Sequence, residues 1–225
     1  MKKSILALFC LLVVAFGDEK IELLGGACES GDLRKCWELG DYLYNYKDDY
    51  AKAVKLYKKA CDGGEAVACS RLGDAYFHGK GVIKDGKKVE ELQSKACDGG
   101  FFHACEWLGR LYKKGNVVRK DDVKAAKLFA KGCDGDNENS CYYLGNAYAN
   151  GEGVEKDEKK AAQLYAKACE SDYCACYKLA SFYENGIGVS KDKNKANELY
   201  NNKPCGDECT IEELKGQCQL QDEYE

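Results

Sequence analysis

Residues 137–172 read NENSCYYLGNAYANGEGVEKDEKKAAQLYAKACESD, and this stretch of 36 residues is one copy of a unit that the chain repeats. Three cysteine pairs, eight residues apart within each pair, recur every 36 residues: Cys61 and Cys69, Cys97 and Cys105, and Cys133 and Cys141. Cys28 and Cys36 repeat the spacing 33 residues upstream, and Cys169 and Cys176 continue the series with one residue missing. A period of about 20–50 residues indicates an array of stacked units, each unable to bury its apolar face alone.

The first half of the unit predicts an amphipathic helix, because its apolar and small residues fall at i, i+3, i+4 and i+7. These residues are Cys141, Leu144, Gly145 and Tyr148. The glycine-rich stretch 151–154 then breaks the helix, and Asp157 is a typical N-cap for a second one. The apolar face of that second helix is Ala161, Leu164, Tyr165 and Ala168. One unit is therefore helix A, loop, helix B, loop.

Applied to the whole chain, this pattern predicts an all-α solenoid. Helices A are expected near 33–45, 66–78, 102–114, 138–149 and 174–184, and helices B near 50–61, 86–97, 122–133, 158–169 and 193–202. A capping helix is expected at 20–28, a second one at 207–218, and an acidic tail at 219–225. No Pro-, Gly- or Ser-rich linker divides residues 18–218, which favours one continuous solenoid.

The N-terminus has the three parts of a secretory signal peptide: a basic start at Lys2 and Lys3, an apolar stretch from Ile5 to Phe16, and a small residue at Gly17. That stretch is shorter than the roughly 20 apolar residues that span a bilayer. We expect a signal peptide at 1–17, cleavage after Gly17, and a secreted or periplasmic protein without stable membrane insertion. The sequence leaves both compartments open.

Removal of the predicted signal peptide takes away Cys10 and two lysines, which leaves 14 cysteines and changes the formal charge from −4 to −6. An even number of cysteines in an exported chain indicates disulfide bonds. A mildly acidic chain is also a poor ligand for polyanions, so we expect no nucleic-acid partner.

Each repeat cysteine pair spans a turn, such as Asp62-Gly63-Gly64, that can bring the two sulfur atoms together. We expect five disulfides: Cys28–Cys36, Cys61–Cys69, Cys97–Cys105, Cys133–Cys141 and Cys169–Cys176. Closing such a short loop stabilises the fold by about 2–3 kcal/mol. The remaining cysteines, Cys174, Cys205, Cys209 and Cys218, allow three connectivities, and the sequence does not choose among them.

The residue pattern predicts no metal site and no cofactor. Zinc sites favour close C-x-x-C pairs, and the chain contains none. Its two histidines, His78 and His103, fall in different repeats and do not supply a set of three ligands.

The composite pattern A-x-x-L-Y-x-K-A-C, A-C-x-x-L-G-x-x-Y and G-x-G-V-x-K-D resembles the Sel-one-like repeats, relatives of the tetratricopeptide repeat. The cysteine pair eight residues apart makes the chain similar to the Helicobacter cysteine-rich protein family. The resemblance covers nearly all of the chain after residue 17. It implies a right-handed α/α superhelix with helices A on the concave face, export, disulfide bonds, and roles in host or cell-envelope interactions.

Some members of that family are described as penicillin-binding proteins or weak β-lactamases, so the resemblance also implies a β-lactam or peptidoglycan-derived ligand as an alternative. The residues do not support a hydrolase. The one S-x-x-K after residue 17, Ser190 to Lys193, occupies a loop and helix start in the repeat register. Ser171-Asp172-Tyr173 is a fragment of S-D-N, and K-T-G is missing. Catalytic residues are therefore unknown, and whether the chain is an enzyme stays open.

The favoured hypothesis is a scaffold that binds an extended peptide or a partner protein on its concave face. The expected groove residues are Trp37, Asp41, Tyr44, Asp74, Phe77, Arg110, Lys113, Tyr142, Asn146, Asn150 and Tyr177. Asn146 is the expected central clamp, because an amide hydrogen-bonds both N–H and C=O groups. Trp37, Tyr142 and Tyr177 are expected to be exposed anchors, while Arg110 and Lys113 are expected to hold a carboxylate. The alternative for each residue is that it packs between repeats or only solvates a surface.

Overall fold

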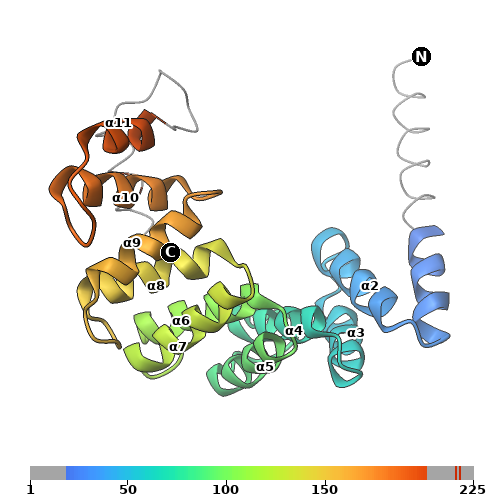
Figure 1. Cartoon of the computed structure of the whole chain (residues 1–225). Helices are drawn as coiled ribbons and strands as arrows, with labels where there is room; N and C mark the ends of the chain where they lie inside the picture. The colour runs from blue at the N-terminus through green and yellow to red at the C-terminus, as the bar shows by residue number, and fades with distance from the viewer. Residues whose placement is uncertain (1–18, 202–215, 217, 219–225) are drawn as a thin grey trace, which may run out of the picture. The chain divides into compact units, whose positions relative to one another are not determined.

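The computed structural model describes residues 19–201 together with residues 216 and 218 (Figure 1). Residues 19–29 are helical, and the helices that follow are α2 (Leu33–Tyr46), α3 (Tyr50–Asp62), α4 (Ala66–His78), α5 (Gly86–Asp98), α6 (Phe102–Lys114), α7 (Asp122–Asp134), α8 (Glu138–Asn150), α9 (Glu158–Ala168), α10 (Tyr173–Asn185) and α11 (Lys193–Asn201). This described part of the chain contains no strand. The predicted all-α fold is confirmed, and the ends of these helices lie within one residue of the predicted bounds.

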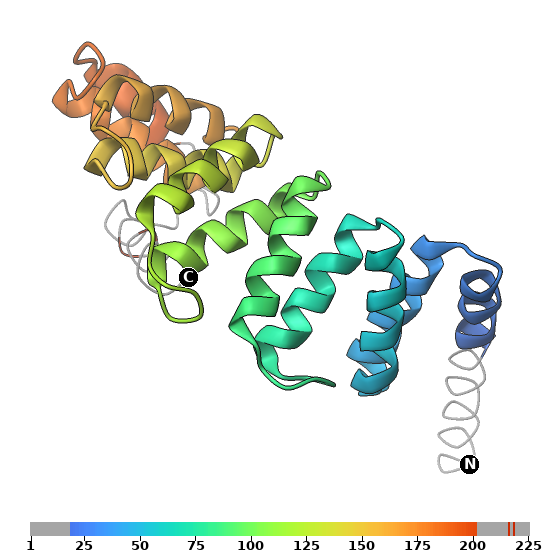
Figure 2. The ribbon, with the colours of Figure 1, turned by 90° about the horizontal axis from the view of Figure 1, so that it is seen from below.

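The helices form two compact units, one up to Phe101 and one from Phe102 onward. In the first unit, α2, α3, α4 and α5 pack consecutively, and in the second α6 to α11 do the same, as Figure 2 shows from below. Each unit is thus a stack of helix A and helix B pairs. The predicted signal peptide (1–17), the tail (219–225) and most of the predicted helix at 207–218 lie outside the described residues, as do Cys205 and Cys209.

Each helix B begins at an aspartate that caps its first turn. Asp157 accepts a hydrogen bond from the backbone N–H of Lys160 at 3.0 Å, which confirms the predicted N-cap. The same bond recurs in the other repeats, from Lys52 to Asp49, Lys88 to Asp85, Lys124 to Asp121 and Lys195 to Asp192. Replacing such a cap with alanine typically costs about 1 kcal/mol, so the period of the aspartates sets where each helix B starts.

A glycine on helix A lets the paired helix B approach closely. A Cβ atom at Gly40 would lie 2.7 Å from the ring of Tyr57, and one at Gly145 would lie 2.7 Å from the ring of Tyr165. Cβ atoms do not approach other atoms this closely, so only glycine fits at these crossings. The small residue beside the repeat leucine is therefore required by the packing.

The second glycine of each G-x-G-V loop packs against the start of the preceding helix B. Gly153 has a φ of +72°, and a Cβ atom there would lie 2.0 Å from the backbone oxygen of Asp122. Gly81 has a φ of +74° and stands in the same relation to the backbone oxygen of Tyr50, at 2.5 Å. Both the left-handed backbone and the contact require glycine. The loop therefore connects consecutive repeats as well as consecutive helices.

Within each unit, disulfides join the end of one helix to the beginning of the following helix A. The bonds Cys28–Cys36, Cys61–Cys69, Cys133–Cys141 and Cys169–Cys176 are confirmed. Cys97 and Cys105 are also disulfide-bonded. Among the connectivities that the sequence left open, the structure selects Cys174–Cys218. Structural disulfides of this density are typical of oxidising compartments, which means the cell exterior or the periplasm.

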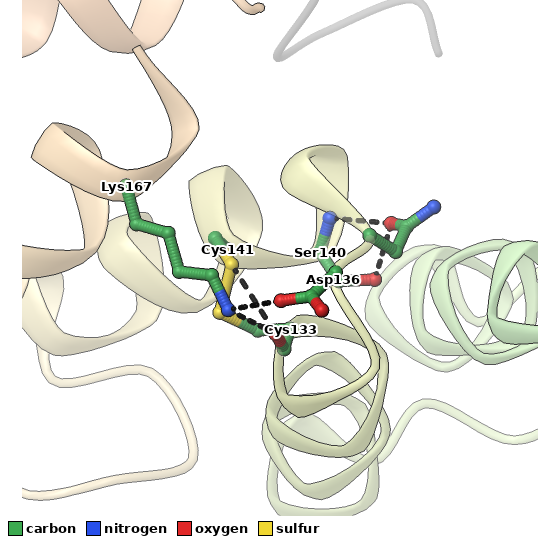
Figure 3. The surroundings of a disulfide bond; sticks show 6 residues. Cys133, Asp136, Ser140, Cys141 and Lys167 are labelled. Carbon is green, nitrogen blue, oxygen red and sulfur yellow. Dashed lines mark hydrogen bonds and ion pairs between the residues drawn. A yellow bond between two sulfur atoms is a disulfide. The ribbon is translucent and has the colours of Figure 1, made fainter. Parts of the chain in front are cut away.

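The lysine of the K-A-C motif connects one repeat to the previous one. Figure 3 shows Lys167 of α9 beside the Cys133–Cys141 disulfide, where its Nζ lies 2.8 Å from the Cys133 carbonyl oxygen and 2.9 Å from Asp136 Oδ1. Lys59 donates in the same way to the carbonyl of Cys28, at 2.8 Å, and Lys95 to that of Cys61, at 2.9 Å. Each of these carbonyl oxygens also accepts a backbone N–H, from Gly31, Gly64 or Asp136, so the lysine adds a second hydrogen bond to it.

Within the described ranges, no helix combines the length and the apolar content needed to cross a membrane.

Candidate binding site

The first unit contains a pocket of about 440 Å³ between the helices A of its two repeats. Its walls come from α2, from one residue of α3, from α4 and from the loop after α4. The lining residues are Asp41, Tyr44, Asn45, Tyr57, Arg71, Asp74, His78 and Lys80. Two acidic and two basic side chains therefore surround a space that also has aromatic walls.

Asp41 holds the three helices of the pocket together. Its carboxylate accepts a hydrogen bond from the Tyr57 hydroxyl at 2.7 Å, and its two oxygens lie 3.1 and 3.2 Å from Nε of Arg71. Burial, together with the hydrogen bond to Asp41, raises the pKa of Tyr57, so the hydroxyl keeps its proton and acts as the donor. Asp41 is thus engaged by the chain itself.

Asp74 is the less completely paired carboxylate. Nη1 of Arg71 lies 4.0 Å from one oxygen, and Nε2 of Gln93 donates a hydrogen bond to the other at 3.1 Å. Burial raises the pKa of Asp74 to about 6, and the neighbouring Asp41 adds to the rise, while Arg71 and Gln93 oppose it. A carboxylate in this position is poorly solvated and has capacity for a further N–H donor.

Tyrosine rings and a lysine form the rim of the pocket. Nζ of Lys80 lies 5.2 Å from the ring centroid of Tyr44 and 4.9 Å from that of Tyr50, within the range of cation–π attraction. The two rings meet edge to face, with centroids 4.9 Å apart. The Tyr50 hydroxyl donates a hydrogen bond to Asp48. These contacts fix the position of Lys80, which follows α4, over the end of α2.

The equivalent position in the second unit is almost closed. There the space has a volume of about 10 Å³ and is lined by Lys113, Asp122, Ala125, Ala126, Phe129, Tyr143, Ala147 and Glu152. In repeat register Tyr143 takes the place of Arg71, and its ring stacks on Phe129 with centroids 5.2 Å apart. Lys113 forms an ion pair with Glu152 at 3.1 Å, where the first unit has Tyr44 and Lys80. The open pocket is therefore a property of particular side chains and not of the repeat itself.

Five of the predicted groove residues belong to the first unit, and three of them, Asp41, Tyr44 and Asp74, line the pocket. Trp37 is half-buried, and its indole nitrogen makes no hydrogen bond to the described residues. Phe77 packs edge to face against His78, with ring centroids 4.9 Å apart. The structure thus brings together the charged and phenolic members of this group but does not place Trp37 or Phe77 in the pocket lining.

In the second unit, the predicted cationic pair already binds carboxylates of the chain. Arg110 donates to Glu106 at 3.0 Å, and its guanidinium carbon lies 5.6 Å from the ring centroid of Tyr143. Lys113 is engaged by Glu152. Both side chains are therefore used in holding this unit together.

Two of the expected groove residues in α8 are internal. Tyr142 was expected to be an exposed anchor, and this is wrong: the residue is 0% exposed, with its ring 5.4 Å from that of Tyr143 and 6.1 Å from that of Tyr165. Asn146 is 5% exposed, and its Oδ1 accepts a hydrogen bond from the Tyr165 hydroxyl at 2.7 Å. The cause is the packing of α9 on α8, because Tyr165 of α9 contacts both side chains.

The last two expected residues lie near the surface. Asn150 is exposed, and its side-chain nitrogen lies 3.4 Å from Oε1 of Glu152. Tyr177 is half-buried, with its ring centroid 5.5 Å from that of Tyr200. Neither residue lines one of the two cavities described above.

Sequence reasoning missed Arg71 and Lys80, which complete the pocket. Arg71 stands two residues after Cys69, a position that was not assigned to the groove, and Lys80 is the variable residue of a G-x-G-V loop. The available signal was the placement of opposite charges on two helices A one repeat apart, with Asp41 on the first and Arg71 and Asp74 on the second.

The S-x-x-K stretch forms a loop and the start of a helix, as the repeat register predicted. Ser190 precedes α11, and Asp192 within the stretch accepts a hydrogen bond from the backbone N–H of Lys195 at 3.0 Å. The serine thus lies in the ordinary loop between helix A and helix B of the last repeat, and this placement provides no support for a hydrolase.

The Sel1 repeat family matches five segments of the chain, residues 36–65, 66–101, 102–137, 139–173 and 175–201. These segments make up more than half of the sequence and coincide with the helix pairs, so the chain belongs to the Sel1 repeat family. It is a disulfide-bonded Sel1 repeat scaffold, an architecture that presents extended surfaces to protein partners.

Solved structures include similar repeat proteins. A protective antigen of uropathogenic Escherichia coli with an SLR fold is 28% identical, with a TM-score of 0.65 over 80% of this chain and 47% of that chain. This chain thus spans about half the length of that antigen. A Sel1 repeat protein from Oxalobacter formigenes is 26% identical, with a TM-score of 0.70 over 76% of this chain and 72% of that chain.

Helicobacter pylori cysteine rich protein B is 34% identical over 59% of this chain and 96% of that chain, with a TM-score of 0.47. The predicted resemblance to Sel-one-like repeats and to the Helicobacter cysteine-rich proteins is thereby confirmed. A comparison with curated protein sequences finds no match.

Proposed function

We propose that this chain is an exported scaffold that binds an extended segment of a partner protein in the pocket between α2 and α4. The proposal rests on the difference in pocket volume between equivalent positions of the two units. This volume is about 440 Å³ in the first unit and about 10 Å³ in the second. The same fold closes this space where Tyr143 and the Lys113–Glu152 ion pair are present. The open pocket with charged and phenolic walls is therefore a candidate for recognition.

The side chains of the pocket suit a peptide backbone. Asp74 can accept an N–H group, because its nearest cation, on Arg71, is 4.0 Å away. Arg71 and Lys80 can donate to carbonyl oxygens. An extended peptide offers both kinds of group in alternation, whereas a polyanion would meet the carboxylates of Asp41 and Asp74. The volume lies in the range of sites that enclose a small ligand, about 300–1,000 Å³, so we expect one anchoring side chain and the backbone beside it.

Export is part of the proposal and is supported by the density of disulfides in the described residues and by the signal-peptide pattern at 1–17. N-terminal sequencing of the protein recovered from the periplasm or the medium of its producing cells should find Asp18 as the first residue. Recovery of a chain that still begins at Met1 would contradict this part of the proposal.

A substitution taken from the chain's own second unit tests the pocket. Arg71→Tyr should fill the space as Tyr143 does, while Arg71→Ala should leave it open. Peptides are selected from a random displayed library on oxidised residues 18–225, and their affinities for the three proteins are measured by calorimetry. We expect a class of peptides that bind Arg71→Tyr at least tenfold more weakly than Arg71→Ala.

Circular dichroism of each variant is the control that checks whether the helices remain intact. If every selected peptide binds Arg71→Tyr and wild type equally, the pocket is not the recognition site and the proposed function fails.

A further inference from the structure

A second groove of about 830 Å³ lies on the first unit, between the helix at 19–29, α2 and α3. The side chains of Leu39 and Leu43 form its floor, and charged residues stand along its edges. The full lining is Ile21, Glu22, Gly25, Gly26, Glu29, Leu39, Leu43, Lys47, Asp49, Lys52, Lys55 and Leu56. None of these residues lines the pocket between α2 and α4.

The groove is present because the loop between helix A and helix B is three residues shorter in the first repeat than in the fourth. In the fourth repeat, the N–H of Asp157 bonds to the carbonyl of Tyr148, nine residues earlier. In the first repeat, the N–H of Asp49 makes the same bond to Leu43, six residues earlier. The three missing residues account for the spacing of 33 rather than 36 between Cys28 and Cys61. They include the glycine that elsewhere packs on the preceding helix B.

The first repeat also lacks the aromatic ring that later repeats have at one position of helix A. Leu43 occupies the position that Tyr112, Tyr148 and Tyr183 have in later repeats. In each of those repeats a lysine Nζ lies 4.5–5.2 Å from the centroid of the tyrosine ring. Lys160, which covers Tyr148, also lies 3.7 Å from Asp157. Lys52, its equivalent, lies 3.7 Å from Asp49, and the first repeat has Leu43 at the position of that tyrosine.

We propose that this groove is a docking site for an aromatic side chain of a partner protein, which takes the place of the missing tyrosine beneath Lys52 and above Leu39 and Leu43. The later repeats show what fills this position in the fold, namely a phenol ring beside a lysine. An ammonium over a ring and an apolar floor under it favour an aromatic occupant over an aliphatic one. The ligand is therefore a segment with one exposed Tyr, Phe or Trp.

The chain itself provides the substitution that should close the groove. Leu43→Tyr restores the ring of the later repeats. Gly26→Leu fills the groove from the opposite wall, where a Cβ atom would meet nothing within 4 Å. Because the two substitutions lie on different helices, a folding defect in one does not remove the test. Arg71→Tyr is the matched control, since it alters only the pocket between α2 and α4.

The experiment is a selection of displayed random peptides on residues 18–225, followed by calorimetry on synthetic peptides. We expect a class of peptides with one aromatic residue that bind Leu43→Tyr and Gly26→Leu at least tenfold more weakly than wild type and bind Arg71→Tyr unchanged. Replacing that aromatic residue with leucine should weaken binding by at least fivefold. Peptides that lose affinity only for Arg71→Tyr report on the other pocket, so the two proposals succeed or fail separately.

Two results would overturn the inference. One is a set of selected peptides that all bind Leu43→Tyr as well as wild type, or that keep their affinity when the aromatic residue becomes leucine. The other is loss of binding when the same peptides are measured on residues 1–225, which would assign the groove to the chain's own first 17 residues.

Discussion

Nε2 of Gln93 lies 3.1 Å from Oδ1 of Asp74, in the place where the neighbouring repeats put an aromatic ring. In the first repeat a tyrosine hydroxyl makes the equivalent bond, from Tyr57 to Asp41 at 2.7 Å. Gln93 is 0% exposed, and its Oε1 makes no hydrogen bond within the described residues. The glutamine therefore donates one hydrogen bond to Asp74, while its own buried amide oxygen has no partner among the described residues.

Gln93→Tyr should stabilise the protein. The tyrosine hydroxyl would bond to Asp74, the unpaired amide oxygen would be removed, and Gly73 leaves room for a ring as Gly40 does for Tyr57. An unsatisfied buried polar group costs about 1–3 kcal/mol, so we expect a gain of about 1 kcal/mol in thermal unfolding followed by circular dichroism. A lower melting temperature would show that the space at Gly73 is too small.

The stability of Asp74→Asn relative to wild type should depend on pH. The pKa of Asp74 is raised to about 6 in the folded protein, against an ordinary value of 3.8. Between these values the folded state binds more protons than the unfolded state, so this group makes the free energy of unfolding fall as pH rises from about 4 to 6. Above that range Asp74 is ionised, and the burial of its charge lowers the free energy of unfolding by its full amount. Partial solvent exposure keeps this destabilisation small.

Asparagine removes this penalty, so the melting temperature of the variant minus that of wild type should increase from pH 4 to pH 7. The comparison cancels the titration of all other groups, which is why the difference is the quantity to follow. A difference that stays constant across this range would mean that Asp74 ionises normally.

Asn146 should behave as a structural residue. Because its Oδ1 accepts the Tyr165 hydroxyl inside the second unit, Asn146→Ala and Tyr165→Phe should each lower stability. In a double-mutant cycle the two changes should couple by about 1 kcal/mol. Additive effects of the two substitutions in urea unfolding would speak against the bond.

Lys167→Met should destabilise the second unit by about 1 kcal/mol, because it keeps the apolar stem but removes the hydrogen bond to the Cys133 carbonyl. Asp136→Asn is the control. Asp136 is 86% exposed, and surface ion pairs contribute little. Equal losses in the two variants would place the stabilising interaction in the ion pair instead.

Replacing both Cys61 and Cys69 with serine should lower stability by about 2–3 kcal/mol, the value for a short closed loop. The helices should remain at low temperature, because the caps and the packing of α3 on α4 are unchanged. Urea unfolding of the oxidised variant measures the loss. If the variant unfolds at the same urea concentration as wild type, this disulfide does not contribute to stability.

The local features of the fold could be predicted from the sequence because their causes are local. Aspartate caps such as Asp157, the glycine of helix A and the eight-residue cysteine spacing each act within one repeat. The orientation of Tyr142 could not be predicted, because it depends on how α7 and α9 approach α8. The pocket depends on Arg71 and Lys80, whose side chains reach across from a second repeat, and periodicity assigned neither of them a role.

The spans of the disulfides also set an order for oxidation during synthesis. Four of the observed bonds join cysteines seven or eight residues apart, whereas Cys174 and Cys218 are 44 residues apart. In a chain that emerges from its N-terminus, each short bond can close as soon as its own turn has appeared. The bond between Cys174 and Cys218 cannot form until Cys218 has been synthesised. Until then Cys174 has a free thiol two residues from Cys176, the partner of Cys169. A disulfide isomerase is therefore expected to act at the last repeat rather than at the repeats whose two cysteines form a single short bond.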